Sequence, residues 1–357
     1  MTTTALSPAA TGRHLATVET ILELAPIEGA DAIVRARIRG WDVVVKLGEF
    51  QVGDLCVYLE VDSMIDMADD RFAFLAPRGV RTDTDGVSGH VLKTARLRGQ
   101  YSQGLALPIG SFPELAGFGP GDDVTDLLPL IKWDPPLPAN LAGAVRGYLP
   151  SWIRATDEER LQNVASILEV GDYTWQATEK LDGMSTTFYV DSTADVDAVE
   201  GVCTRNMDLL PSDNLLWTSA RALGIHALIA DTFPGRRAVV QGETFGEGIQ
   251  GNPLQRKGQA FAAFNLLVDG SSVPREQWPA WLVAISVPIR DDLTFPTTVD
   301  QGLADVDRLK SALAPARAAE GVVWRSTTDE LVLLADGRMV RASFKTVSNH
   351  YLLKADR

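Results

Sequence analysis

Short apolar segments, separated by residues typical of turns, fill the amino-terminal part of the chain. Within residues 13–110 the apolar positions gather at 20–24, 41–46, 55–61, 90–97 and 104–109. Runs of this length, bounded by Gly and Asp, predict β-strands. Several short strands in so small a span predict a β-barrel, and the OB fold is a common barrel of that size. A small sandwich or an SH3-like barrel would produce the same pattern.

The pattern breaks after about residue 130. Closely spaced prolines disfavour regular structure, so residues 131–155 are predicted to be an interdomain linker. A helix is then predicted from Thr156 to about residue 168. Thr156 would cap it, Glu159 would complete a capping box, and the acidic residues of the first turn favour a helix start.

From residue 173 onward, strand and helix patterns mix without regular alternation. We expect strands at 173–179, 185–190, 201–205, 237–243, 260–267, 321–325 and 338–344, and helices at 213–223, 275–284 and 299–313. Such an order predicts an antiparallel α+β domain. The predicted fold class is therefore α+β, with an OB-type barrel over residues 13–130 and a second domain over 156–357.

Composition narrows the class of protein. A chain of 357 residues is long enough for two domains, and no apolar run is long enough for a membrane helix, so no membrane partner is expected. Residues 1–12 lack the features of a secretory signal and are predicted to be a disordered tail. Cys56 and Cys203 have no metal-ligand spacing, which favours a cytoplasmic protein without structural zinc.

The net charge of −14 argues, taken alone, against a nucleic-acid partner, because phosphate binding requires Lys and Arg. The basic residues are nevertheless concentrated in segments 71–104 and 338–357. In the first of these we expect Lys93, Arg96, Arg98 and Gln103 to contact a nucleic acid. A solvated basic surface would produce the same pattern.

One short motif can carry chemistry. Lys180-Leu181-Asp182-Gly183 lies where a predicted strand ends in a turn, so the lysine would be presented to a ligand on a rigid support. Alone, this K-x-D-G pattern is weak, and an ordinary surface turn would explain it. The argument depends on the residues that follow in order, mostly at the ends of strands: Arg205, Glu243, Phe261 with Phe264, Glu320 and Lys345.

This order of residue types resembles the covalent nucleotidyltransferase superfamily of ligases and mRNA capping enzymes, over roughly residues 156–350. Within it, the chain is most similar to RNA ligases of the Deinococcus type, over nearly its whole length. Further matching segments are 156–163, 343–354, 48–54 and 98–105. DNA ligases and capping enzymes carry their OB domain after the last lysine motif, whereas here the barrel comes first. The chain departs from its relatives at Asn265, where phage RNA ligases tend to have Asp, and at Ser343, where many have a lysine.

The resemblance implies ATP as the nucleotide, with Mg²⁺ or Mn²⁺, and RNA or an RNA-containing duplex with a break as the partner. No obligate protein partner is implied. Lys180 would be the nucleophile that forms lysyl-AMP, and Asp182, followed by Gly183, would orient its loop. Lys345 would hold the α-phosphate. Attack requires an unprotonated amine, and Lys345 and the metal ion would lower the pKa of Lys180.

The resemblance also implies the remaining nucleotide contacts. Glu179 would line the purine pocket, Glu243 would bind ribose hydroxyls, and Glu320 would hold metal-bound water. Arg205 would contact the ribose or the 5′-phosphate of the acceptor strand. Phe264 would stack on adenine, with Phe261 as its competitor.

Three functions remain open from the sequence. The first is an ATP-dependent RNA ligase that joins 3′-OH and 5′-phosphate ends through lysyl-AMP and an adenylated strand. The second is another polynucleotide ligase or a GTP-using capping enzyme. The third is a non-catalytic RNA-binding protein built on the OB fold.

Overall fold

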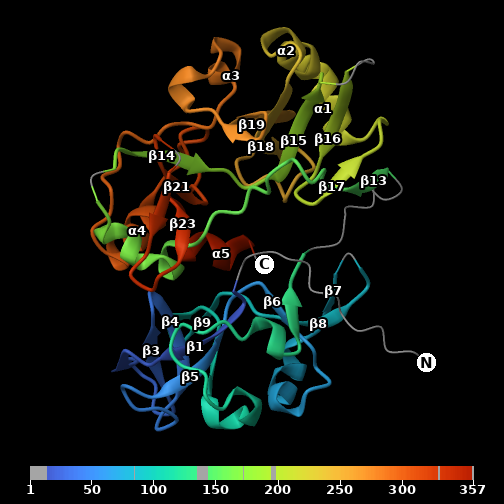
Figure 1. Cartoon of the computed structure of the whole chain (residues 1–357). Helices are drawn as coiled ribbons and strands as arrows, with labels where there is room; N and C mark the ends of the chain where they lie inside the picture. Colours follow the sequence, from blue (N-terminus) through green and yellow to red (C-terminus); the bar gives the residue numbers. More distant parts are fainter. Residues whose placement is uncertain are drawn as a thin grey trace, which may run out of the picture. The chain divides into compact units, whose positions relative to one another are not determined.

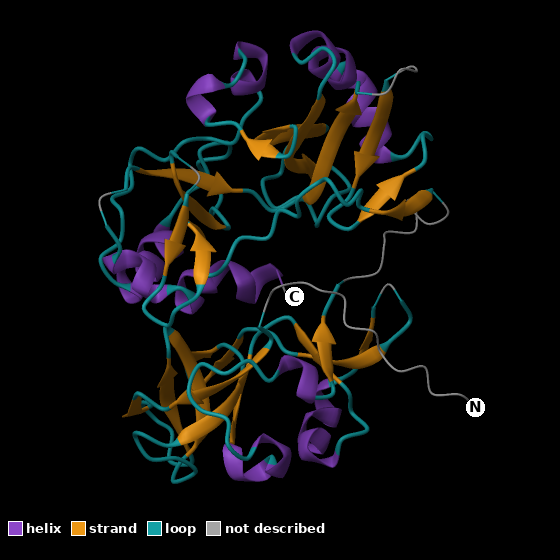
Figure 2. Cartoon of the chain, viewed as in Figure 1, coloured by secondary structure: helices purple, strands orange, loops and turns teal. Residues whose placement is uncertain are grey.

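The computed structural model describes residues 14–83, 85–134, 144–171, 173–193, 198–328 and 330–355. The chain divides into two compact units, Met1–Leu137 with Leu353–Arg357, and Pro138–Leu352. The predicted tail at 1–12 and much of the predicted linker lie outside the described residues, and the predicted domain boundaries stay predictions. Strands predominate in both units (Figures 1 and 2).

The amino-terminal unit is built from short antiparallel strands. They are β1 (Ala16–Thr20), β2 (Glu23–Pro26), β3 (Ile33–Ile38), β4 (Trp41–Lys46), β5 (Leu55–Leu59), β6 (Ser63–Ile65), β7 (Arg81–Thr82), β8 (Ser88–Val91), β9 (Ala95–Leu97), β10 (Gln100–Ser102), β11 (Leu105–Pro108) and β12 (Leu130–Lys132). Sheets form in the orders β1-β5-β11, β2-β3-β4, β12-β6-β8-β7 and β10-β9. The prediction at 41–46 coincides with β4, whereas β3 was missed because Arg35 and Arg37 obscure its alternation.

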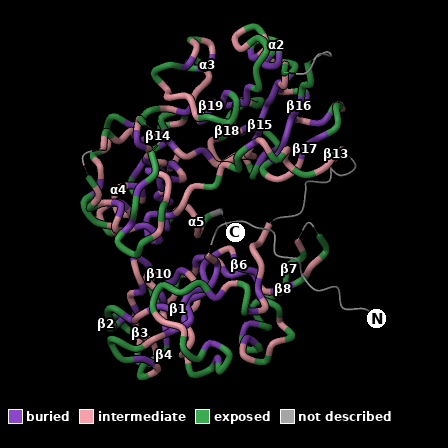
Figure 3. Tube along the Cα trace, in the orientation of Figure 1, coloured by how far each residue is buried: buried purple, intermediate pink, exposed green. Residues whose placement is uncertain are grey.

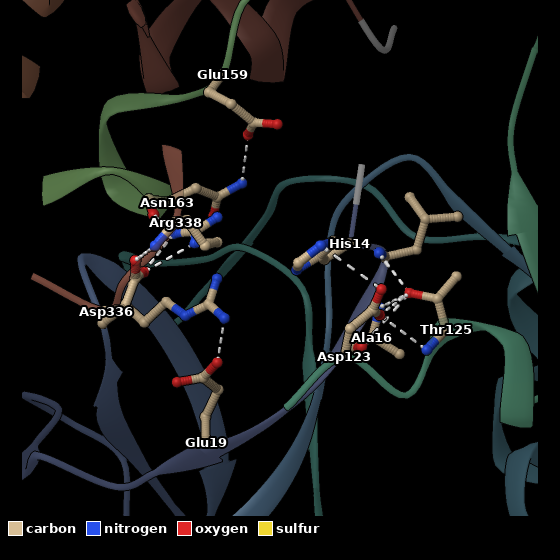
Figure 4. A network of polar contacts seen from close by, with 11 residues as sticks. His14, Ala16, Glu19, Asp123, Thr125, Glu159, Asn163, Asp336 and Arg338 are labelled. Atoms are coloured by element: carbon tan, nitrogen blue, oxygen red, sulfur yellow. Dashed lines mark hydrogen bonds and ion pairs between the residues drawn. The ribbon is translucent and has the colours of Figure 1, made fainter. Parts of the chain in front are cut away.

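Two apolar cores hold this unit together. Trp41 and Tyr58 are fully buried in one, and Phe72 and Phe112 in the other. A polar contact ties the start of β1 to the chain near residue 125. The Thr125 hydroxyl accepts hydrogen bonds from the backbone of Leu15 at 2.9 Å and Ala16 at 3.1 Å (Figure 4).

The carboxy-terminal unit contains a large antiparallel sheet with the order β13-β17-β16-β15-β18-β19-β20. Its strands are β13 (Val145–Tyr148), β15 (Met184–Asp191), β16 (Val199–Cys203), β17 (Met207–Leu209), β18 (Arg237–Gly246), β19 (Gln259–Val268) and β20 (Ser271–Ser272). Helices α1 (Leu215–Leu223), α2 (Ile225–Thr232) and α3 (Ala280–Ala284) pack on one face and bury an apolar core with it (Figure 3).

A smaller sheet completes this unit, with the order β14-β21-β24. It comprises β14 (Trp175–Lys180), β21 (Gly321–Ser326) and β24 (Ser343–Val347), and helix α4 (Val299–Arg308) packs against it (Figure 1). A hairpin of β22 (Leu331–Leu333) and β23 (Met339–Arg341) precedes β24, and helix α5 (Asn349–Ala355) follows it. In the described part of the chain, no helix has the length and apolar character needed to span a membrane.

The helix predicted to begin at Thr156 is wrong. Residues 154–159 are irregular, and short 3₁₀ helices follow at Leu161–Asn163 and Ala165–Glu169. The acidic residues expected in the first turn instead bind side chains distant in sequence. Asp157, for example, lies 2.8 Å from Lys345, whereas Glu159 accepts a hydrogen bond from the nearby Asn163 amide at 3.2 Å (Figure 4). Long-range pairing therefore overrides the local capping pattern.

Candidate active site

The register of the β14–β21–β24 sheet places Lys180 and Lys345 on the same face. Lys180 pairs with Gly321, which pairs with Val347, and two residues along the strands Val323 pairs with Lys345. Directly paired residues project to the same side, and so do residues two apart in one strand. Arg325 is two residues beyond Val323, so its side chain joins this face. The smaller sheet thus carries a row of cations.

Lys180 ends β14 among carboxylates. Its Nζ donates a hydrogen bond to Glu320 Oε1 at 2.6 Å, where β21 is about to begin. Burial alone would lower the pKa of Lys180, but the negative charges of Glu320, Glu243 and Asp182 outweigh it and raise that pKa. Without nucleotide and metal, Lys180 is therefore an ammonium ion. This direction is opposite to the one that the resemblance implies for the reacting complex.

The carboxylates near Lys180 are themselves perturbed. Burial raises the pKa of Glu243 to about 8, although Lys180 opposes the shift, and burial also raises the pKa of Glu320. Glu243 lies in β18 and pairs with Ser185 of β15, so the large sheet contributes it. Such shifts of neighbouring groups are typical of functional sites.

The turn after Lys180 requires glycine. A Cβ atom on Gly183 would lie 2.4 Å from the carbonyl oxygen of Thr244 and 3.0 Å from Glu243 Cγ. Only glycine permits this close approach of the lysine turn to β18. Asp182 in the same turn accepts a hydrogen bond from the Tyr351 hydroxyl at 2.8 Å.

The segment 156–159, here called the acidic strap, covers the row of cations. Asp157 Oδ1 lies 2.8 Å from Lys345 Nζ and 3.7 Å from Arg205 Nη2, so it brings together two residues predicted for phosphate binding. Glu158 accepts hydrogen bonds from Arg325 at 2.5 Å and from the Ser343 hydroxyl. The strap is held beside β24 by a backbone hydrogen bond from Lys345 to Glu159.

The two competing phenylalanines occupy different surroundings. Phe261 is 6% exposed and packs edge-on against Phe188 in the core of the large sheet, at 4.8 Å between ring centroids. Phe264 is only partly buried and lies at a β-bulge, because Gln241 pairs with Asn265 whereas Gly242 pairs with Ala263. Bulges commonly re-aim a side chain beside an active site. Phe264 is thus the better placed of the two for stacking.

Glu179 projects to the opposite face from Lys180, since neighbours in a strand alternate. One oxygen accepts hydrogen bonds from Arg290 at 3.3 Å and from the backbone of Ala312 at 2.7 Å. The other oxygen, Oε1, is buried without a hydrogen-bond partner among the described residues. The structure does not bring Glu179 to the face of Lys180, and its role in the purine pocket stays a prediction.

The residues predicted to bind nucleic acid in the barrel differ strongly in exposure. Gln103 is 2% exposed, and its side-chain amide lies 3.3 Å from the Thr94 hydroxyl. Its backbone carbonyl oxygen accepts a hydrogen bond from the Tyr58 hydroxyl. Arg96 and Arg98 are exposed, and Arg96 lies over the Tyr101 ring. Gln103 thus contributes to packing.

A divalent metal ion fits this donor set through water. Among the described residues, no three His, Cys, Asp or Glu side chains are grouped closely enough to enclose a metal directly. Glu320 Oε2 is nevertheless buried without a hydrogen-bond partner in the described structure, so it can accept from a water molecule. Mg²⁺ typically keeps several waters and binds through one or two carboxylates plus phosphates. Glu320 and Glu243 satisfy that pattern.

Several residues of this site were missed from the sequence. Asp157 and Glu158 were attributed to a helix start, and Arg325 and Tyr351 were given no role. Arg325 lies two residues after Val323 on a strand that follows Glu320, so the two side chains share a face, and this spacing was a usable signal for Arg325. Nothing in the sequence places the strap or Tyr351 beside the lysine turn.

Comparison with known proteins agrees with the order of the two domains. Residues 15–109 match an OB-fold domain, and residues 173–347 match the RNA ligase family. The structure is similar to a Naegleria gruberi RNA ligase mutant with AMP and Mn, with 39% identity, a TM-score of 0.81, and coverage of 97% of this chain and 100% of that one. The same ligase with PPi gives 39% identity, coverage of 97% and 100%, and a TM-score of 0.80. No curated protein matches the sequence at a significant level.

The fold and these matches define a nucleotidyltransferase, with an OB-fold domain preceding the RNA ligase domain. The predicted α+β fold with an amino-terminal OB domain is confirmed. At this identity over nearly all of both chains, the chain belongs to the RNA ligase family. The finer assignment to the Deinococcus type stays a prediction.

Proposed function

We propose that this protein is an ATP-dependent RNA ligase that joins 3′-OH and 5′-phosphate ends. The observation that carries the proposal is the position of Lys180, at a strand end among three carboxylates and on the same face as Lys345. The similar Naegleria gruberi ligase has been solved with ATP and Mn, which supports ATP and a divalent metal as the ligands here.

In the first step, the Lys180 amine attacks the α-phosphorus of ATP. A P–N bond forms, the bond to pyrophosphate breaks, and the former ammonium proton must have left Nζ. Glu320, at 2.6 Å, is the group within hydrogen-bond reach of that proton. Lys345 stabilises the charge that develops on the α-phosphate.

Phosphate binding requires Asp157 of the acidic strap to give up its contacts with Lys345 and Arg205. Asp157 now lies between Lys345 and Arg205, where a carboxylate satisfies the same cations that a phosphate would. The negative phosphates of ATP replace Asp157, while Glu158 keeps Arg325 and Ser343 in place. Arg205 is then available for the ribose or the 5′-phosphate of the acceptor strand.

The remaining residues fix the nucleoside. Phe264 stacks on adenine from its bulge, and Glu243 binds ribose hydroxyls. A metal ion held through water by Glu320 and Glu243 would neutralise phosphate charge and disfavour the ammonium form of Lys180. Asp182 and Gly183 fix the turn that presents the lysine.

Two further steps complete the reaction. An oxygen of the RNA 5′-phosphate attacks the lysyl-AMP phosphorus, so the P–N bond breaks and an adenylated RNA end forms. The 3′-hydroxyl of the second end then attacks the 5′-phosphate, a phosphodiester forms, and AMP leaves. The OB domain, through Lys93, Arg96 and Arg98, holds the RNA backbone. Cys56 and Cys203 are both free thiols, which supports a role in the cytoplasm. The repair of broken RNA is the process that such a reaction would serve.

The test uses ATP or GTP labelled at the α-phosphate, with Mg²⁺ or Mn²⁺, followed by denaturing electrophoresis. We expect label from ATP to remain on the protein, to be released by acid, and to be absent from Lys180→Ala. Lys257→Ala changes an exposed lysine and is the matched control. Label from GTP alone would indicate a capping enzyme, and no label on folded, AMP-free protein would favour an RNA-binding protein.

A further inference from the structure

We infer that Tyr351 is a positioning residue for the adenylylation of Lys180, because its hydroxyl holds the Asp182 carboxylate away from the nucleophile. The inference rests on the proposed function, since it assigns the nucleophile to Lys180. It adds the carboxy-terminal helix α5 to the machinery of the reaction.

The contact between Tyr351 and Asp182 is short and partly shielded from water. The hydroxyl donates to Asp182 Oδ2 at 2.8 Å, and Tyr351 is half-buried. Burial, reinforced by the Asp182 charge, raises the pKa of Tyr351, so the phenol keeps its proton and always acts as the donor. A hydrogen bond from a neutral hydroxyl to a carboxylate is among the stronger kinds.

Tyr351 cannot easily move from this position, because the start of α5 is fixed. The Ser348 hydroxyl accepts a hydrogen bond from the Tyr351 backbone at 3.0 Å, as a helix cap does. The same hydroxyl donates to Asp307 of α4 at 2.7 Å, and His350 also donates to Asp307 through its backbone. The tyrosine is therefore placed by a capped helix that is bonded to a second helix.

The same helix start also holds Glu320. The backbone N–H of Ser348 donates to the carbonyl oxygen of Glu320 at 2.9 Å, and the Glu320 side chain binds Lys180 at 2.6 Å. These hydrogen bonds link Lys180 through Glu320, Ser348 and Tyr351 to Asp182, and the backbone between Asp182 and Lys180 closes the ring. The segment that begins α5 thus holds the Glu320 backbone and the Asp182 carboxylate, two of the three acidic residues near the nucleophile.

The ring explains why Lys180 has one ion-pair partner and not two. In the described residues its ion pair is with Glu320, although the Asp182 charge is near enough to raise the lysine pKa. With its Oδ2 atom bound to Tyr351, Asp182 is kept from turning toward Nζ. Without the hydroxyl, Asp182 would form a second ion pair with Lys180, and that pair would have to break before the amine could attack.

The test is Tyr351→Phe, which removes the hydroxyl and keeps the ring. Formation of lysyl-AMP is followed in single turnovers over a range of ATP concentrations, with Tyr148→Phe as a control at a tyrosine that is 76% exposed. We expect the maximal rate to fall about 10-fold, as for loss of one hydrogen bond to a charged group. The half-saturating ATP concentration and the melting temperature should match those of the control.

A double-mutant comparison with Asp182→Asn then separates positioning from general damage. If Tyr351 acts through Asp182, adding Tyr351→Phe to Asp182→Asn will slow the reaction by less than 2-fold. An unchanged rate in Tyr351→Phe, a shift in half-saturation equal to the rate loss, or independent effects in the double mutant would overturn the inference. Failure of the wild-type protein to form lysyl-AMP would instead overturn the proposed function and this inference with it.

Discussion

Two groups of cations stand out in this chain, and the structure holds them in different ways. Lys180, Lys345 and Arg205 are each bound by a carboxylate from a distant part of the carboxy-terminal unit. Arg96 and Arg98 of the barrel are exposed, and Arg96 contacts the nearby Gly99 carbonyl and Tyr101 ring. The first group is organised before any ligand arrives, whereas the second belongs to a local turn.

The difference indicates how each group can act. A cation held in place by long-range contacts needs no reorganisation when a phosphate replaces its partner, which suits stabilisation of a transition state. An exposed arginine in a turn contributes mainly charge, which suits binding an RNA backbone without regard to its sequence. The predictions that follow test whether the two groups separate in this way, from the largest effect to the smallest.

Loss of the nucleophile should have the largest effect. Lys180→Met removes the amine and keeps an unbranched side chain of similar length. We expect formation of lysyl-AMP to disappear, whereas sealing of an RNA supplied with a 5′-adenylated end persists, because that step needs no nucleophile from the protein. Gel analysis of both reactions tests this. Equal loss of both reactions in a folded protein would contradict the role of Lys180.

Loss of Lys345 should have the second-largest effect, because Lys345 stabilises charge on the α-phosphate and forms no covalent bond. We expect Lys345→Ala to slow lysyl-AMP formation by about 100-fold, the effect typical of losing one group that stabilises a transition state. Lys257→Ala, a change of an exposed lysine outside the sheet, is the control. Single-turnover kinetics at saturating ATP provide the measurement, and a loss confined to ATP affinity would contradict the assignment.

The two lysines just discussed are among the residues that the sequence could predict. Lys180, Glu243, Glu320 and Lys345 were predicted because their order and residue types resemble the nucleotidyltransferase superfamily, and that order does not depend on exact strand boundaries. The acidic strap could not be found in this way. Its residues make contacts more than a hundred positions away, whereas its local pattern of Thr156 followed by acids predicts a helix cap.

The same distinction applies to the fold. Strands with a single buried face, such as β4, were located well because alternation is a local property. The helix predicted over 275–284 is interrupted in the structure, and Pro279 immediately precedes the short helix α3. Gln103 was given a binding role because it lies in the basic segment 71–104 and in the segment 98–105 that resembles RNA ligases. Its burial depends on Thr94 and Tyr58, which local sequence does not reveal.

The barrel arginines should have a smaller effect, of a different kind. We expect the Arg96→Ala, Arg98→Ala double mutant to bind RNA about 10-fold more weakly, and to reduce the slope of log affinity against log salt by about 2. Lysyl-AMP formation should stay unchanged. Gln103→Ala should instead lower the melting temperature and leave the salt slope intact. Fluorescence anisotropy with labelled RNA at several salt concentrations decides between these outcomes.

The acidic strap allows a sharper test of the pre-organised group. Asp157→Asn removes the charge that competes with phosphate for Lys345 and Arg205. We therefore expect ATP to bind about 5-fold more tightly in the absence of metal, since an exposed ion pair of about 1 kcal/mol no longer has to be broken. Calorimetric titration measures this, with Asp300→Asn as a control on α4. Weaker binding would show that Asp157 assists the nucleotide.

The last prediction concerns Glu243 and the stability of the nucleotide-free protein. Burial raises the pKa of Glu243 to about 8, against about 4.3 in an unfolded chain. Between these values the folded protein holds a proton that the unfolded protein has released, so stability falls as the pH rises through this window.

The variant Glu243→Gln resembles the protonated form of Glu243. It loses the attraction between the carboxylate and Lys180, but the cost of burying the carboxylate is larger than that attraction. We expect this variant to be more stable than the wild type at pH 8, and the difference to shrink as the pH falls toward 5. Urea denaturation of the nucleotide-free protein at both pH values, with Glu276→Gln as an exposed control, measures the difference. A variant that is less stable than the wild type at pH 8 would show that the attraction of Glu243 to Lys180 outweighs burial. The carboxylates would then be stabilised before ligand binding, just as the cations are.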